Sequence, residues 1–115
     1  MTFNAVLESW APGRHCLNLS GRLDSTTRAQ FEPQATELAS QDGVFLVLNC
    51  EELDYVASAG LRVFLMAAKR VQQHGGRMVV CGLQPAVREV FEISGFLKIL
   101  TVVADVAAAR ALAEG

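Results

Sequence analysis

The central part of the chain, residues 44–82, constrains the fold more than any other segment. Residues 44–49 form a continuous apolar run with the length of a buried strand, and residues 78–81 form a second run. Apolar side chains recur at helical spacing between these two runs. Gly75 and Gly76 follow the helical segment, and glycine commonly ends a helix because it adopts a positive φ without penalty. The pattern predicts two strands of one sheet joined by a crossover helix.

The segments on either side extend this unit into an alternating series of strands and helices. The order strand-strand-helix-strand-helix-strand-helix-strand-helix indicates an α/β fold, a small mixed β-sheet with helices packed mainly on one face. Pro33 is an objection to the first helix, because proline removes an amide hydrogen and can kink a helix. The outer strands are expected at residues 3–7, 16–19 and 97–103, and the outer helices at residues 27–40, 85–94 and 106–112.

The composition narrows the class of protein. With 115 residues, of which 51% are hydrophobic, the chain is predicted to form a single domain over residues 1–115. The net charge of -2 argues against a general nucleic-acid binder, and no apolar run approaches the roughly 20 residues of a membrane helix. The three cysteines lie in apolar runs without paired metal-ligand spacing, and no signal peptide precedes them. We therefore expect reduced thiols in the cytoplasm, no metal and no cofactor.

Ser58 lies at the switch from the central strand to the central helix. Read as an ordinary structural residue, it is a helix N-cap that contributes about 1 kcal/mol. Read as a regulatory residue, it is a phosphorylation site, since the small residues Ala57, Ala59 and Gly60 would let a kinase or partner approach the backbone closely. Phosphate would add about -1.5 to -2 charges beside the helix N-terminus. The helix dipole and Arg62 can tolerate that charge, whereas a partner packed against this surface would have to desolvate it.

A catalytic role for Ser58 is the rival interpretation. Residues 56–60 approach the G-x-S-x-G elbow of serine hydrolases, but Val56 replaces the first glycine. His74 lies at the far end of the helix, roughly 22 Å away at 1.5 Å per residue. His15 is not excluded by this argument, but the chain is too short for a hydrolase core with a substrate pocket. We predict that the chain is not an enzyme.

The acidic residues just before Ser58 are predicted to form a solvated loop rather than a metal or acid–base cluster. These residues are Glu51, Glu52 and Asp54.

Several short motifs, in order and at matching spacing over nearly the whole chain, resemble the STAS domain family. Within that family, the chain is similar to the stand-alone anti-sigma factor antagonists of bacteria. The motifs are Gly21-Arg22-Leu23-Asp24 and residues 47–49, 55–61, 75–81 and 85–95.

The resemblance implies partner switching, with no catalysis by the STAS domain itself. The unphosphorylated domain is expected to bind an anti-sigma factor that is also a GHKL-type serine kinase, which frees a sigma factor. Phosphorylation at Ser58 then releases the complex, and a PP2C-type phosphatase resets it. No direct nucleic-acid contact and no membrane insertion are implied. The partner surface implied by the resemblance comprises Asp24, Ser25, Tyr55, Ser58, Ala59, Gly60, Arg62 and Val63.

Two residues depart from the family pattern. Many antagonists carry Asp before the phosphorylated serine and Ser or Thr after it, where this chain has Ala57 and Ala59. Ala59 leaves one hydroxyl to modify, whereas Ala57 weakens the expected kinase recognition. The alternative function is therefore a constitutive STAS adaptor, in a stressosome-like or transporter complex, with Ser58 serving only as an N-cap. Arg62 is expected either to contact an acidic surface of the partner or to shield the phosphate.

Overall fold

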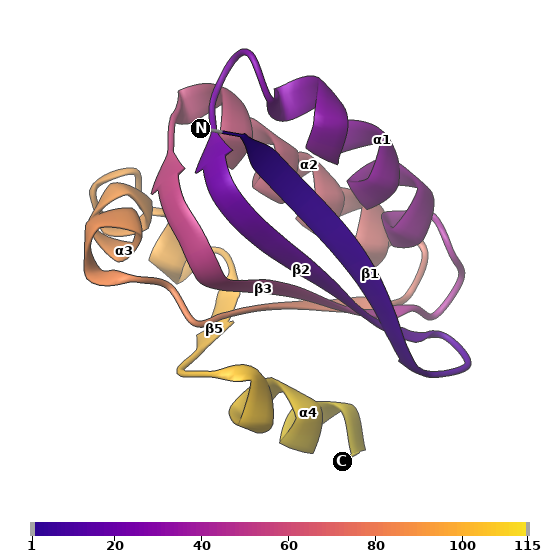
Figure 1. The fold of residues 1–115 in the computed structure, drawn as a ribbon. Coiled ribbons are helices and arrows are strands. Elements are labelled where there is room, and N and C mark those ends of the chain that lie inside the picture. The colour runs from indigo at the N-terminus through magenta and orange to yellow at the C-terminus, as the bar shows by residue number, and fades with distance from the viewer. Residues whose placement is uncertain (1, 115) are drawn as a thin grey trace.

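A computed structural model describes residues 2–114 and contains one five-stranded sheet flanked by helices (Figure 1). The strands lie in chain order across the sheet, β1-β2-β3-β4-β5. β1 is antiparallel to β2, and every other neighbouring pair is parallel. The sheet is therefore mixed, as predicted. The strands are β1 (Phe3–Ala11), β2 (Arg14–Leu23), β3 (Phe45–Val56), β4 (Arg77–Cys81) and β5 (Thr101–Val103).

α1, α2 and α3 connect the parallel strands, α4 follows the last strand, and the helices cover the two faces of the sheet unequally. α1, α2 and α3 pack on one face, and α4 lies alone on the opposite face (Figure 1). This arrangement confirms the prediction that the helices lie mainly on one face. None of the helices within residues 2–114 is long and apolar enough to cross a membrane. The helices are α1 (Arg28–Ala39), α2 (Ser58–Gln73), α3 (Pro85–Ile93) and α4 (Val106–Glu114), with a short 3-10 helix, η1 (Phe96–Lys98), after α3.

The larger core lies between the sheet and the three helices α1, α2 and α3. A row of aromatic rings crosses it, with centroids 5.9, 5.5, 5.1 and 6.3 Å apart between successive rings. Such spacings are typical of tilted and edge-to-face aromatic contacts. The row therefore joins β1 to all three helices of this face. In order, its members are Phe3, Phe31, Phe64, Phe91 and Phe96.

The first helix forms as predicted, despite the objection from Pro33. The helix runs through Pro33, which is exposed. One face of the helix is apolar and carries Phe31, Ala35, Leu38 and Ala39, all of them buried. Burial of this face offsets the hydrogen bond that proline cannot donate.

The central strand is longer than its apolar run, and the predicted acidic loop is wrong. β3 continues to Val56, so Glu51, Glu52 and Asp54 belong to a strand and not to a loop. The continuation pairs with β2 alone, because pairing between β3 and β4 ends at Asn49. Irregularities in the β2–β3 register break strict alternation, which is why the buried side chains of this segment do not follow a period of two.

The last predicted strand is also corrected. Residues 96–98 form η1, and only Thr101–Val103 form β5. Gly95 has φ +79, and the amides of Lys98 and Ile99 donate to carbonyl groups three residues earlier, at 3.2 and 3.1 Å. These local hydrogen bonds use the groups that a longer strand would offer to β4.

Candidate functional site

The candidate site lies at the carboxyl ends of the neighbouring strands β2 and β3. Leu23 and Val56 are paired across these strand ends. The Ala57 amide then donates to the Leu23 carbonyl at 2.9 Å, which joins the two chain segments beyond the paired strands. The loop before α1 and the first turn of α2 consequently emerge side by side at these strand ends (Figure 1).

Ser58 is the first residue of α2, and the prediction that it caps the helix is wrong. The N-cap is Ala57, whose backbone is still extended at φ -107 and ψ 173, and no side chain caps this end. Ala57 continues the direction of β3, so the helix begins at Ser58, one residue earlier than an N-cap at Ser58 would place it. The Ser58 side chain is exposed, and its hydroxyl makes no hydrogen bond within residues 2–114. The hydroxyl is therefore free for contact or modification.

Two residues of the predicted partner surface, Gly60 and Val63, are buried. Gly60 is buried, and a Cβ there would come within 2.6 Å of the Leu23 side chain and 3.1 Å of Val56. The missing side chain allows α2 to approach the ends of β2 and β3 closely. Val63 is 2% exposed and belongs to the core. The accessible surface must be redrawn without these two residues, because both are buried.

The loop that contains Asp24 and Ser25 is held by a compact set of hydrogen bonds. Asp24 Oδ1 accepts from the Thr26 hydroxyl at 2.7 Å, the Thr26 amide at 2.9 Å and the Thr27 amide at 3.1 Å. The Thr26 hydroxyl is the main reason that the pKa of Asp24 is lowered, followed by these amides. Asp24 therefore presents a fixed negative charge, while Ser25 is exposed beside it.

Thr27 is a site residue that the sequence did not reveal. Its hydroxyl donates to the Arg22 carbonyl at 2.7 Å and accepts from the Asp24 amide at 2.9 Å. Thr27 is buried, so it fixes the loop from beneath. The spacing of Asp24 and Thr27, three residues apart before a helix, is the local signal that identifies this loop.

Arg22 is the second missed residue, and it connects Asp24 to Tyr55. Its guanidinium carbon lies 4.0 Å from the centroid of the Tyr55 ring, and its Nε lies 4.0 Å from Asp24 Oδ2. Tyr55 is 40% exposed, so this stacked pair forms part of the surface beside Ser58. Arg22 and Tyr55 face each other because their strands pair at these positions. The strand register, which the sequence does not state, creates the contact.

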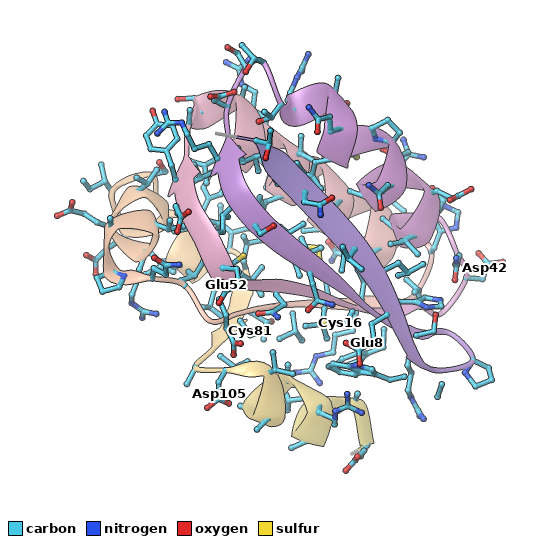
Figure 2. All side chains as sticks on the ribbon, in the orientation of Figure 1. Glu8, Cys16, Asp42, Glu52, Cys81 and Asp105 are labelled. Atoms are coloured by element: carbon cyan, nitrogen blue, oxygen red, sulfur yellow. The ribbon has the colours of Figure 1, made fainter. Side chains whose placement is uncertain are left out.

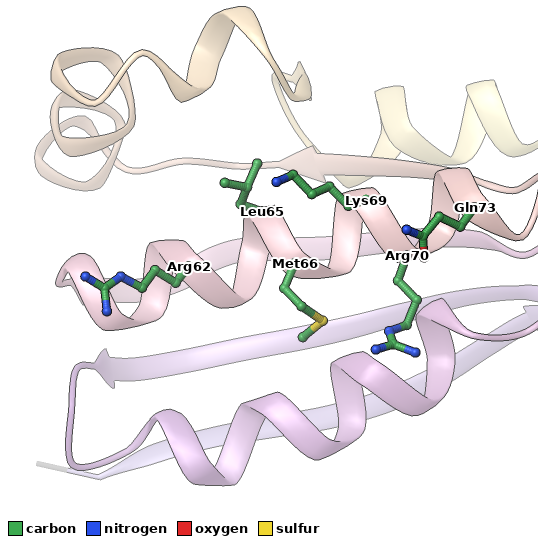
Figure 3. Close-up of a pocket in the computed structure, with 6 residues that line it drawn as sticks. All are labelled: Arg62, Leu65, Met66, Lys69, Arg70 and Gln73. Atoms are coloured by element: carbon green, nitrogen blue, oxygen red, sulfur yellow. The ribbon is translucent and has the colours of Figure 1, made fainter.

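Arg62 is exposed one helical turn beyond Ser58 and extends the site along α2. It lines a pocket of about 400 Å³ on the outer side of this helix, together with five other α2 residues (Figure 3). Ala59, in the first turn, is partly exposed. The accessible members of the predicted surface are thus Asp24, Ser25, Tyr55, Ser58, Ala59 and Arg62, with Arg22 added by the structure.

Neither histidine lies near Ser58. His15 is at the start of β2, where its ring hydrogen-bonds Ser9 Oγ at 2.9 Å and Gln41 Oε1 at 3.1 Å. Leu23, at the candidate site, lies eight positions further along the strand, about 26 Å away at 3.3 Å per residue. His74 follows the other end of α2, where it contacts Asp42 at 2.9 Å. Ser58 thus has no histidine base in this arrangement.

The cysteines are buried thiols away from the candidate site. Burial is the main cause that raises the pKa of Cys16 to about 11 and that of Cys81 to about 12. Burial also raises the pKa of Cys50 well above its usual value. Cys16 and Cys81 belong to the cluster beneath α4, as Figure 2 shows, whereas Cys50 belongs to the larger core. These neutral thiols act as small apolar side chains.

The chain is similar in sequence to two proteins named for antagonism of anti-sigma factors. One is BtrV of Bordetella bronchiseptica, 45% identical over 84 residues, which span 73% of this chain and 72% of BtrV. Its name describes it as an anti-sigma factor antagonist. The other is the anti-sigma F factor antagonist of Paenibacillus polymyxa, 33% identical over 87 residues, which span 75% of this chain and 74% of that protein.

Solved structures of anti-sigma factor antagonists share the fold. An antagonist from Mycobacterium paratuberculosis has a TM-score of 0.88 at 18% identity, with 99% of this chain and 96% of that chain covered. SpoIIAA in its unphosphorylated form has a TM-score of 0.81 at 22% identity, with 97% and 98% covered. SpoIIAA of Bacillus has also been solved in its phosphorylated form. The model of the STAS domain matches residues 11–109, and the chain therefore belongs to the STAS domain family.

Proposed function

We propose that this protein is a cytoplasmic anti-sigma factor antagonist that works by partner switching at Ser58. In its unphosphorylated form it binds an anti-sigma factor that is also a GHKL-type serine kinase, and a sigma factor is released. The kinase transfers the γ-phosphoryl group of ATP to the Ser58 hydroxyl, ADP leaves, and the complex dissociates. A PP2C-type phosphatase hydrolyses the phosphoserine and restores the binding form.

The observation that carries this proposal is the free, exposed hydroxyl of Ser58 on the first turn of α2. A side chain engaged in capping would have to leave its hydrogen bond before it could react, and Ser58 has no such bond. The neighbouring residues Ala57 and Ala59 are small, so a kinase can approach the backbone. The names of the relatives support the antagonist role, and the solved phosphorylated form of SpoIIAA supports the switch.

The same geometry explains how phosphate can change binding without unfolding the domain. At the first residue of a 16-residue helix, phosphate lies at the positive end of the helix dipole. Its charge would be partly offset there, so the fold should be retained. A partner packed over Ser58 and Tyr55 would instead have to bury the charge beside the fixed carboxylate of Asp24, which disfavours the complex.

One residue favours the second candidate, a constitutive STAS adaptor that binds its partner without a phosphorylation switch. Ala57 stands where many antagonists of this family carry Asp, which removes a charge next to the acceptor serine. In this alternative the exposed surface around Ser58 binds a partner, but the kinase does not recognise the serine.

Incubation with ATP and a GHKL-type serine kinase from the same organism separates the two candidates. Intact mass followed by peptide mapping should show one added phosphate on Ser58. Ser58→Ala should abolish the modification and retain kinase binding. Ser25→Ala, a matched change on the neighbouring exposed loop, should leave phosphorylation of Ser58 intact. A stable complex without phosphate would favour the adaptor. Phosphate on another residue would contradict the assignment of Ser58.

A further inference from the structure

The outward side of α2 carries an unusual set of side chains for a helix face turned to solvent. Six residues follow each other at spacings of three and one, so they form one stripe along the helix (Figure 3). The stripe is opposite the buried face of α2, which includes Leu61, Phe64 and Val71. We call it the α2 outer face. Its members are Arg62, Leu65, Met66, Lys69, Arg70 and Gln73.

This face is positively charged and lacks carboxylates. α2 contains three cations and no Asp or Glu along its 16 residues. None of the ion pairs formed among residues 2–114 includes a cation of the α2 outer face. On the adjacent helix α1, Glu32 is engaged with Arg28 at 3.7 Å. An exposed helix of a folded domain normally mixes both signs of charge, so three cations without an acidic partner indicate complementarity to another molecule.

Two apolar side chains lie between the cations. Leu65 and Met66 are partly exposed and line the pocket of about 400 Å³. Met66 reaches toward α1, where its sulfur lies 3.8 Å from Thr36 Oγ1, while Arg70 Nη1 donates to Ser40 Oγ at 3.4 Å. Leu65 and Lys69 point to the other side of α2 (Figure 3). The face therefore offers an apolar centre with charged ends.

A second hollow continues this surface on the side of η1 and β5. Its volume is about 460 Å³, and it shares Leu65 and Lys69 with the first pocket. Its rim includes Ile99, which is 62% exposed, and the cation Arg77. No carboxylate lines either hollow. The positive and apolar character thus extends over both flanks of α2.

We infer that the α2 outer face docks an acidic amphipathic helix of the anti-sigma factor. Arg62 and the Lys69–Arg70 pair are about two helical turns apart, roughly 11 Å at 1.5 Å per residue. A matching helix carries carboxylates two turns apart, with apolar residues between them that pack on Leu65 and Met66. This inference rests on the proposed function, because the occupant belongs to that partner. It extends the partner surface from Arg62 along α2, beyond the first turn that carries Ser58, and acts by charge complementarity.

Binding of the proposed GHKL-type serine kinase to charge-reversed variants tests this site. Titration calorimetry should show that Lys69→Glu/Arg70→Glu weakens binding by roughly tenfold or more and lowers its salt dependence. The matched control is Arg88→Glu/Lys98→Glu, which makes the same charge change on exposed residues of α3 and η1 and should stay within about twofold. Lys69→Gln/Arg70→Gln should give an intermediate loss of affinity. This neutral variant replaces the charge-reversed one in the test if the latter does not fold.

The outcomes separate this inference from the proposed function. Equal binding by the α2 variant and its control, with binding still lost in Ser58→Glu, would overturn the docking site and leave the switch standing. Failure of the wild-type protein to bind the kinase would overturn both.

Carbodiimide cross-linking of the wild-type complex identifies the occupant. The reagent joins an amine to a nearby carboxylate with loss of water, so Lys69 should become linked to Asp or Glu in a helical segment of the kinase. A cross-link from Lys69 to a second copy of this chain would overturn the assigned occupant, as would its absence in a complex that is cross-linked elsewhere.

Discussion

The two faces of the sheet bury very different side chains. On the face covered by α1, α2 and α3, Phe31, Phe64 and Phe91 are completely buried. On the other face, α4 buries only Ala109 and Ala113, while its larger side chains are partly exposed. Because the hydrophobic contribution grows with buried apolar area, the first face supplies most of the stability and α4 supplies little. The candidate site belongs to the strongly packed face, so Ser58 is presented from a rigid support.

Because the two faces of the sheet are packed so differently, we expect Phe64→Ala to cause the largest loss of stability. Phe64 is 0% exposed and lies between the rings of Phe31 and Phe91. Its truncation should lower the free energy of unfolding by about 3–5 kcal/mol, measured by urea denaturation. Leu112→Ala on α4 is the control and should cost clearly less, since Leu112 is only partly buried. Equal losses would mean that the two faces contribute alike.

Gly60→Ala should produce the next largest loss of stability. Gly60 lies where the face covered by α1, α2 and α3 meets the candidate site. The new Cβ would lie 2.6 Å from Leu23 Cγ, which is fully buried and must shift. We expect a loss of about 1–3 kcal/mol in the free energy of unfolding. Ser58→Ala, two residues away and exposed, should change it little because no capping bond is lost. A neutral Gly60→Ala would show that the first turn of α2 is not tightly fixed.

Thiol reactivity compares the two faces within one molecule. Cys16 and Cys81 lie beneath α4, whereas Cys50 lies in the larger core. If α4 detaches more easily than the domain unfolds, Cys16 and Cys81 should react at least about tenfold faster than Cys50 with a thiol reagent under native conditions. Mass mapping over time measures these rates, and the urea-unfolded chain provides the reference. Equal native rates would mean that α4 opens only when the whole domain unfolds.

The smallest effect is expected for Arg110→Ala on α4. The guanidinium carbon lies 4.1 Å from the centroid of the Trp10 ring, and Nη2 lies 3.7 Å from Glu8. The ion pair is largely exposed and adds little, so the cation–π contact should dominate a loss of about 0.5–1 kcal/mol. Trp10 is the single tryptophan, so its fluorescence reports this change directly. An unchanged emission spectrum would contradict docking of α4 over Trp10.

The sequence predicts the strongly packed parts of the fold better than the site itself. The central strand-helix-strand unit and the buried face of α1 follow from apolar periodicity, which is local information. The length of β3 does not, because Glu51, Glu52 and Asp54 look like a loop until their pairing with β2 is known. The contact of Arg22 with Tyr55 depends on the same irregular register.

Local sequence rules also do not predict that α2 begins at Ser58. A serine at a strand–helix junction favours the N-cap position, yet the extended backbone of Ala57 takes it. The hydrogen bond from the Ala57 amide to the Leu23 carbonyl fixes that geometry, and it joins residues far apart in sequence. A tertiary contact therefore decides whether the hydroxyl is engaged or free.

The central claim is that charge at Ser58 breaks a complex without breaking the fold. The direct measurement is the affinity of the fully phosphorylated protein for the proposed GHKL-type serine kinase, compared with that of the unphosphorylated protein. The melting temperatures of both forms are measured alongside. We expect affinity to fall by roughly a hundredfold, as burial of an uncompensated charge costs several kcal/mol, while the melting temperature changes by only a few degrees. Unchanged affinity of the phosphorylated protein would contradict the switch, and a collapse of the melting temperature would show that phosphate acts on the fold instead.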